Sequence, residues 1–329
     1  MSSTQAADTL ATRVRCPICR QKLVVDGGLA EPTRCDACAV SFRVTPDGLP
    51  VFVELDGQLP AGRIASLKAY EDLRQICRDS LDGHLHLPMC APPVREGILY
   101  RRFVDWPVQA AIHLLGEENL RGAKILHVGP GRANEARLFL PYGVRLVALD
   151  IAADCLRCTR DAAREADWPY EGFLVGPIEY APFDDDAFDL VLLHKTVQWW
   201  VDSERGLREA FRVGKRVLLI ADPAAGWVRR LAQRLRIANT HSPVTKRPIN
   251  EVSRARLKTV LPSARVRVRR YIGKAIDSSS PRRWVVAVDR IPVLAALVAT
   301  VIVTVNFLFG RFGNQVVAVA ERDPSVTSR

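Results

Sequence analysis

Four cysteines near the start of the chain are spaced as metal ligands. Cys16 and Cys19 form one C-x2-C pair, and Cys35 and Cys38 form a second pair fifteen residues later. Each pair makes a tight turn that directs two thiolates at one point, and two turns together give the tetrahedral four-sulfur coordination that suits Zn²⁺. A redox pair or four unrelated thiols are the alternatives. Four sulfur ligands leave no open coordination position, so a zinc ion here would be structural or would present a substrate, and would not be catalytic.

A glycine-rich turn and a later carboxylate form a second group that could do chemistry. Gly129 and Gly131 follow the apolar run 124–128, where glycine lets the backbone turn sharply and approach a ligand closely. Residues 134–140 are expected to form a helix whose first N–H groups bind anions. Asp150 ends the next apolar run, 19 residues after Gly131, near the spacing of a carboxylate that binds ribose hydroxyls. Together these features indicate a nucleotide-type site.

The segments that must position these residues alternate between strand and helix. Regular alternation of this kind predicts a parallel sheet with helices on its faces. The expected fold class is therefore α/β, with a Rossmann-like, doubly wound, mostly parallel seven-stranded sheet preceded by a small four-cysteine zinc ribbon. A C-terminal strand with an earlier hairpin partner completes the sheet. The expected strands are 124–128, 144–150, 173–176, 188–194, 215–223, 265–273 and 314–322, with helices at 152–166 and 203–212.

The order of these motifs resembles class I S-adenosylmethionine-dependent methyltransferases. The most specific stretch is E-x-x-P-F-x-D-x-x-F-D-L-V at 179–191, because nicotinamide dehydrogenases share the glycine turn but lack this run. The resemblance covers roughly residues 95–222 together with the C-terminal strand. A stretch of about 40 residues, from the first cysteine pair through SFRVTPDGLPVFV (41–53), resembles the small zinc ribbons that accompany methyltransferases or are fused to them.

The resemblance implies where the cofactor S-adenosylmethionine binds. Gly129 and Gly131 would let its methionine part lie against the turn. Asp150 would bond both ribose hydroxyls, and Ile151 would pack on the adenine. The loop from Gly176 would edge the other side of the adenine.

His194 and Glu179 complete the implied site. His194 would face the methyl group at the end of the fourth strand, and it titrates near neutrality. It is therefore the candidate base that takes a proton from an oxygen or nitrogen acceptor, with a merely lining histidine as the alternative. Glu179 is a candidate adenine ligand or, alternatively, a structural acid.

Three positions depart from the family pattern. His127 stands where an acid usually begins the first motif, and Ala133 replaces the third glycine of the turn. Pro177 stands where an acid after Gly176 would normally contact the adenine. These departures bear directly on the strength of cofactor binding.

Charge and hydropathy mark the last third of the chain. The net charge is +11, and residues 205–290 carry 22 Lys and Arg against 5 Asp and Glu. Within that stretch, 225–238 mixes apolar and basic residues as a basic amphipathic helix does. Residues 291–309 contain no charge over 19 residues. Since a strand of the core follows at once, we expect a segment in the membrane interface or an apolar lid, with a buried core helix as the alternative.

These features divide the chain and suggest its function. The expected units are a zinc ribbon (1–55), a helical linking or capping region (56–123) and the methyltransferase domain (124–329) with an apolar insertion near 276–312. The favoured acceptor is an apolar or membrane-linked small molecule such as a lipid, a quinone-like ring or a lipid-linked sugar. We expect a cytoplasmic protein with peripheral contact at the inner face of the membrane through 225–238 and 291–309. An RNA base methyltransferase and a non-catalytic cofactor-binding scaffold are the alternatives, although an RNA backbone would not explain the apolar run.

Overall fold

The computed structural model describes most of the chain. It covers residues 13–24, 31–56, 67–82, 98–235, 240–241, 248–272 and 287–323. Its strands are β1 (Thr33–Cys35), β2 (Val40–Val44), β3 (Pro50–Asp56), β4 (Lys124–Val128), β5 (Arg145–Asp150), β6 (Tyr170–Val175), β7 (Leu190–His194), β8 (Arg216–Pro223), β9 (Ala264–Tyr271) and β10 (Gln315–Arg322). Its helices are α2 (Leu67–Leu81), α3 (Ile98–Leu115), α4 (Ala153–Glu165), α5 (Ser203–Val213), α6 (Trp227–Arg234), α7 (Arg254–Val260) and α9 (Pro292–Phe309).

A seven-stranded sheet in the order β6-β5-β4-β7-β8-β10-β9 forms the centre of the molecule. Its first five strands run parallel, and β10 lies antiparallel between β8 and β9. The predicted α/β fold class, the seven strands and the hairpin partnership of the last two are confirmed. The chain reverses strand order at β4, and in open sheets of this kind ligands bind at that switch point.

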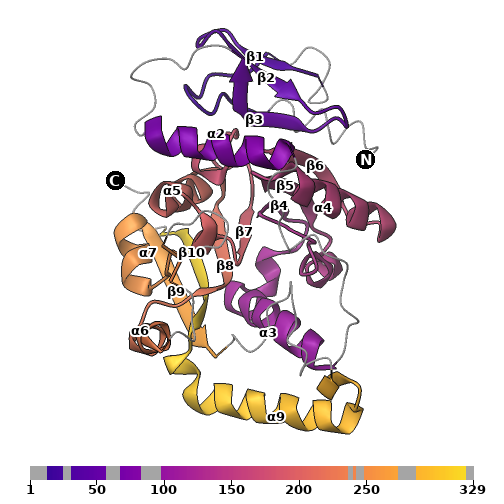
Figure 1. Cartoon of the computed structure of the whole chain (residues 1–329), viewed down its shortest axis with the longest axis vertical. Coiled ribbons are helices and arrows are strands. Elements are labelled where there is room, and N and C mark those ends of the chain that lie inside the picture. Colours follow the sequence, from indigo (N-terminus) through magenta and orange to yellow (C-terminus); the bar gives the residue numbers. More distant parts are fainter. Residues whose placement is uncertain are drawn as a thin grey trace.

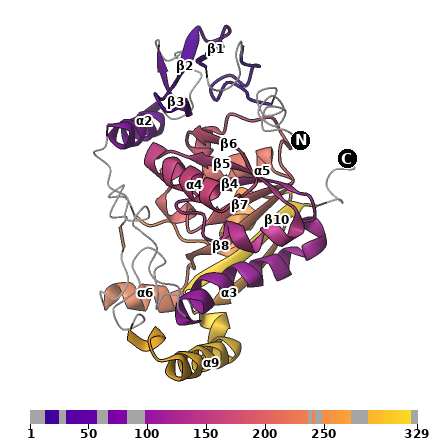
Figure 2. The same ribbon diagram turned by 90° about the vertical axis from the view of Figure 1, so that its right-hand side faces the viewer.

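The central strands are mostly apolar and largely buried because both faces of the sheet are covered. All five residues of β4 are buried, as expected for a strand in a doubly covered parallel sheet. One face packs against α4, α5 and α7, with Leu156, Leu207 and Leu257 in a single core. The opposite face packs against α3 through Val108 and Ile112. Figure 2 shows α3 and α4 on these two faces.

The ribbon extends the sheet, which the sequence did not predict. Strands β1, β2 and β3 form an antiparallel meander, and β3 pairs in parallel with β6 at Val51 and Val175. The described sheet therefore has ten strands, with the ribbon and α2 at one end of the molecule (Figure 1).

The prediction of a helix after the glycine turn is wrong. Residues 134–140 form no α-helix; two short 3₁₀ turns, Ala136–Leu138 and Leu140–Tyr142, lead into β5. Pro141 lies at the start of the second turn, and Gly143 ends it in the left-handed region at φ 64°. A proline lacks the N–H that an α-helix needs, and a left-handed glycine stops it.

Helix α9 lies on the outside of the molecule, at the end opposite the ribbon (Figure 1). It is long and apolar enough to span a membrane by length and composition, yet only 11% of its most apolar stretch is buried. Its buried residues are Ala295 and Ala299, which pack on Leu99 of α3. The alternative of a buried core helix is therefore wrong. Residues 236–238 of the predicted amphipathic segment and 276–286 of the predicted insertion lie outside the described residues.

Candidate functional site

The predicted cofactor residues follow the carboxyl ends of four neighbouring parallel strands. Gly129 follows β4, Asp150 ends β5, Gly176 follows β6 and His194 ends β7. Since parallel strands present their carboxyl ends at one edge, these residues line the same rim of the sheet. The structure thus brings together residues separated by up to 65 positions in the chain.

The turn after β4 needs glycine because its backbone is left-handed. Gly129 and Gly131 have φ angles of 62° and 56°, and Ala133 has 51°. A Cβ on Gly129 would lie 2.4 Å from the side chain of Thr196, so that position has room only for glycine. Ala133 adopts the same region at a cost of about 1–2 kcal/mol. Thr159 stabilises the turn, because its hydroxyl donates a hydrogen bond to the Gly131 carbonyl at 2.7 Å.

Asp150 is placed as a ribose ligand would be. It is 8% exposed, and its Oδ1 accepts the Ala152 N–H at 2.9 Å. This bond fixes the carboxylate at the strand end before any ligand arrives. Ile151 is half-buried against the core at the same rim, where an apolar side chain suits an adenine ring.

Glu179 has a structural task in the described chain. Its Oε1 accepts the backbone N–H groups of Val201 and Asp202 at 3.1 and 3.4 Å, before the start of α5. Burial raises the pKa of Glu179 to about 7, although these N–H groups oppose that rise. These contacts account for the acid without a cofactor, and its adenine contact stays a prediction. Pro177, with φ −81°, precedes the short 3₁₀ turn that carries Glu179.

The sequence analysis missed Glu135, which stands between two histidines. Its Oε1 lies 2.8 Å from Nδ1 of His194 and 3.2 Å from Nε2 of His127. Burial opposes ionisation, but the two histidines hold the pKa of Glu135 well below its usual range. A carboxylate only accepts hydrogen bonds, so both of these ring nitrogens carry hydrogen. Nδ1 of His127 then accepts from the Tyr170 hydroxyl at 2.8 Å.

This network explains the departure at His127. His127 contacts the buried carboxylate of Glu135, eight residues later, so an acid still lies beside the start of this motif. The unusual histidine was the signal, because a buried imidazole needs a partner and a nearby acid is the simplest one. With Nδ1 of His194 bonded to Glu135, its Nε2 is the nitrogen that can take a proton.

The four N-terminal cysteines form a candidate metal centre. Their sulfur atoms lie within 4.8 Å of one another, with Cys16–Cys38 at 3.9 Å and Cys19–Cys35 at 3.5 Å. Sulfurs bound to one tetrahedral Zn²⁺ stand about 3.8 Å apart. Burial raises the pKa of the Cys16 thiol and raises that of Cys38 to about 11. Four thiolates there need a cation, and the donor set fits Zn²⁺.

The ribbon docks against the central domain through ion pairs and a strand. Arg15 bonds Asp184 at 2.6 Å, and Arg20 bonds Glu209 of α5. Asp47 accepts from two arginines of α4, and Arg157 holds its pKa well below the usual range. Phe52 of β3 lies close to Gly176, because a Cβ added to that glycine would be 3.6 Å from the Cβ of Phe52. The ribbon therefore contacts the expected adenine end of the site.

Comparison with known proteins places the central part of the chain in a family. Residues 126–217 match the methyltransferase domain family. This match identifies residues 126–217 as a methyltransferase domain. The predicted cofactor residues all lie inside this methyltransferase domain, whereas the ribbon, α3 and α9 lie outside the match.

Curated relatives carry the same kind of domain. Malonyl-(acyl-carrier protein) O-methyltransferase of Serratia marcescens is 33% identical over 112 residues, which are 33% of this chain and 42% of the relative. The Yersinia pestis protein of that name is 31% identical over 121 residues, 36% of this chain and 43% of the relative. The matched part of the chain thus spans less than half the length of these relatives.

Solved structures align with a larger share of the chain at low identity. The PH0226 protein of Pyrococcus horikoshii aligns with a TM-score of 0.45 at 15% identity, covering 67% of this chain and 91% of that protein. A structure from Thermotoga maritima, described as a SAM-dependent methyltransferase and possible histamine N-methyltransferase, has a TM-score of 0.44 at 16% identity. This alignment covers 68% of this chain and 92% of the Thermotoga maritima protein.

Proposed function

We propose that this protein transfers a methyl group from S-adenosylmethionine to an apolar or membrane-linked small molecule. The observation that carries the choice of acceptor is α9, an apolar helix that the fold holds at the surface next to the methyltransferase domain. Leu297, Val301 and Phe307 on it are 61%, 54% and 85% exposed. An apolar surface of this extent marks an interaction site rather than an ordinary solvated face.

The proposed donor site uses the residues of the glycine turn and the rim. Gly129 and Gly131 would admit the methionine part, and Asp150 would bind the ribose. When bound, S-adenosylmethionine supplies an electrophilic methyl group. His194, held by Glu135, would take the proton of an oxygen or nitrogen acceptor at Nε2. Zinc, bound by the four cysteines, would stabilise the ribbon.

The surroundings of α9 favour an anionic membrane surface. Helix α6 presents Trp227, Leu231 and Leu235 to solvent, and α6 and α9 lie at the same end of the molecule in Figures 1 and 2. Exposed arginines accompany both helices, and each basic residue near an anionic surface contributes about 1 kcal/mol. The exposed arginines are Arg230, Arg234, Arg290 and Arg311.

RNA suits this surface less well. Arg229, part of the predicted basic face, is 2% exposed and forms an ion pair with Glu251 at 2.6 Å. It therefore points into the protein, while apolar side chains of the same helix face solvent. A phosphate backbone would leave those apolar groups and all of α9 in water.

Methyl uptake from labelled S-adenosylmethionine tests the proposed function. We expect label to enter the organic phase when the protein is incubated with a total lipid extract, and not to enter added total RNA. Label in RNA alone would overturn the choice of acceptor. Absence of label in both, with cofactor binding still detected by calorimetry, would support the non-catalytic cofactor-binding scaffold.

Flotation with vesicles tests the membrane contact separately. We expect the protein to float with vesicles of phosphatidylcholine and phosphatidylglycerol in equal parts. The double variant L297D/V301D should bind them about 100-fold more weakly, because it removes two apolar side chains and adds two charges that anionic lipid repels. Arg208→Glu on α5, which changes the charge by the same amount at a distant exposed site, is the control. Equal loss in both would mean that charge alone holds the protein to the vesicles.

A further inference from the structure

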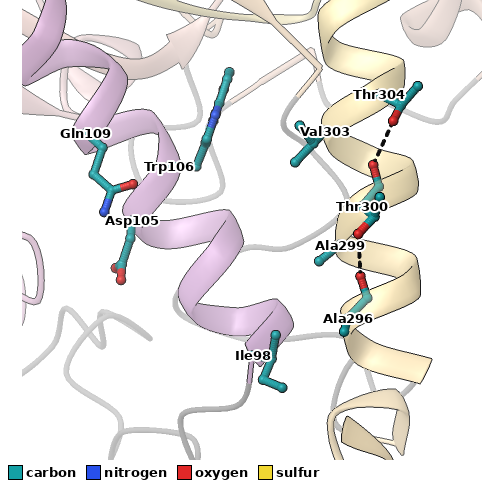
Figure 3. A pocket seen from close by; sticks show the side chains of 9 residues that line it. All are labelled: Ile98, Asp105, Trp106, Gln109, Ala296, Ala299, Thr300, Val303 and Thr304. Carbon is teal, nitrogen blue, oxygen red and sulfur yellow. Dashed lines mark hydrogen bonds between the residues drawn. The ribbon is translucent and has the colours of Figure 1, made fainter. Parts of the chain in front are cut away.

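A groove of about 590 Å³ lies between α3 and α9. Figure 3 shows Ile98 and Ala296 toward one end of it, and Trp106 and Val303 toward the other. Its walls are mostly apolar, because α9 lines it with the side chains of Ala296, Ala299 and Val303. The groove is lined from both helices and lies outside the cofactor rim described above.

The groove is a fixed feature because α9 is tied down near both ends. Before its start, Asp289 accepts the backbone N–H of Leu99 at 2.7 Å. Near its end, the Asn306 side chain accepts from the N–H of Ile272 at 2.7 Å and donates to its carbonyl at 3.1 Å. A helix that only covered the core would bury its apolar face. Helix α9 is fixed in place with much of its apolar face exposed.

Aromatic rings connect the groove to the sheet. The Trp106 ring packs edge-on against Tyr271 at the end of β9, with 5.2 Å between ring centroids. Tyr271 is 2% exposed, and its hydroxyl has no hydrogen-bond partner among the described residues. A buried tyrosine hydroxyl normally finds a partner, so this one is available to a ligand.

Asp222 lies near Tyr271 at the carboxyl end of β8. Its side chain is completely buried, and Oδ1 accepts the Gln198 N–H at 3.3 Å. Within the part of the chain that is described, Oδ2 has no partner. Burial raises the pKa of Asp222 to about 8, and burial together with the Asp222 charge raises the pKa of Tyr271 well above its usual value.

Thr196 carries a third unsatisfied group, beside the cofactor turn. Its hydroxyl has no partner in the described residues, and its methyl group would collide with a Cβ on Gly129. Leaving a buried polar group unsatisfied costs about 1–3 kcal/mol. Tyr271, Asp222 and Thr196 thus each bury a polar atom that has no partner among the described residues, and Tyr271 adjoins the groove through Trp106.

We propose that the α3–α9 groove binds the methyl acceptor, that the acceptor opens a path past Trp106 to these buried polar atoms, and that it is a phenol-type ring on an apolar chain. The chain would lie between α3 and α9, the ring against Trp106 and Tyr271, and the hydroxyl at Oδ2 of Asp222. Above pH 8, where Asp222 is ionised, a hydroxyl can donate to its carboxylate and accept from Tyr271 or Thr196, so one group satisfies more than one orphan atom. This inference rests on the proposed function for the role of the ligand as acceptor.

Binding of 4-octylphenol to the full-length protein without S-adenosylmethionine tests the site. We expect calorimetry at about pH 9, where Asp222 is ionised, to detect 4-octylphenol binding, and its methyl ether 4-octylanisole, which has no hydroxyl to donate, to bind about tenfold more weakly. Ala296→Trp, which fills the groove, should abolish binding of both. Leu297→Trp, at the next residue but outside the groove lining, should leave both unchanged. Asp222→Ala should remove the preference for the phenol while it keeps 4-octylanisole binding, which also shows that the variant is folded.

Two results would overturn this site. One is equal binding by Ala296→Trp and Leu297→Trp, and the other is equal affinity for the phenol and its ether. Failure of the proposed function looks different: the phenol binds in the groove, but no lipid extract takes up a methyl group. Conversely, methyl uptake by lipid without any effect of Ala296→Trp would leave the function intact and remove the groove from it.

Discussion

Replacing Cys35 by serine should abolish zinc binding and unfold the ribbon. We expect the isolated protein to carry about one zinc ion per chain, and the C35S variant to carry almost none. Structural zinc contributes about 10–16 kcal/mol of apparent binding free energy in small zinc-dependent units, far more than the ribbon core can supply alone. Zinc analysis and limited proteolysis measure both effects, with cleavage expected inside residues 13–56 of the variant.

Cys158→Ser is the matched control for this loss. Cys158 lies half-buried in α4, apart from the four-sulfur cluster, so its variant should keep the zinc ion and the protease resistance. Removing the metal from the unaltered protein with a chelator should reproduce the C35S digestion pattern. A ribbon that stays resistant after both treatments would show that its ion pairs to the domain, rather than a metal, hold it folded.

Replacing Asp150 by alanine should weaken S-adenosylmethionine binding by about 100-fold. The carboxylate would accept two ribose hydroxyls, and a hydrogen bond to a charged group contributes about 1.5–3 kcal/mol. Because Ala152 already fixes Oδ1, little ordering is required when the ribose binds. Calorimetric titration of the purified variant with the cofactor measures the change.

Asp154→Ala controls for a general charge effect. Asp154 lies in the first turn of α4, four residues further on, and pairs with Arg157 at the surface. Its variant should bind the cofactor as the unaltered protein does. An unchanged affinity in Asp150→Ala would mean that the rim does not bind the ribose, and the assignment of the other rim residues would then fail with it.

The sheet was predictable because its strands are buried on both faces. Short, largely apolar runs such as 124–128 and 188–194, which alternate with predicted helices, indicate buried parallel strands. The structure confirms these strands. The turn after β4 was harder. Its glycine pattern was read correctly, but Pro141 and Gly143 overrode the expected helix in a way that local propensity alone should have indicated. The pairing of β3 with β6 involves residues over 100 positions apart, and no local signal reports it.

The candidate site was predictable only where a family motif marks it. Gly129, Asp150 and His194 follow from motif and spacing, and the fold places them on one rim. Glu135 was missed because it lies in a segment that was expected to be an ordinary helix. Asp222 was missed because an acid within the run 215–223 looks like a strand ending, and only the structure shows that one of its oxygens is buried without a partner among the described residues.

The two outer strands of the sheet affect how the protein behaves when crowded. At one end β1 is three residues long, and at the other β9 carries Arg265, Arg267, Arg269 and Arg270. Short edge strands and charged edge strands both resist pairing with the edge of another molecule. The pairing of β3 with β6 at Val51 and Val175 also covers the apolar end of β6, which would otherwise be open. Loss of the ribbon should therefore expose the edge of β6 and lower the solubility of the protein, because exposed strand edges pair between molecules.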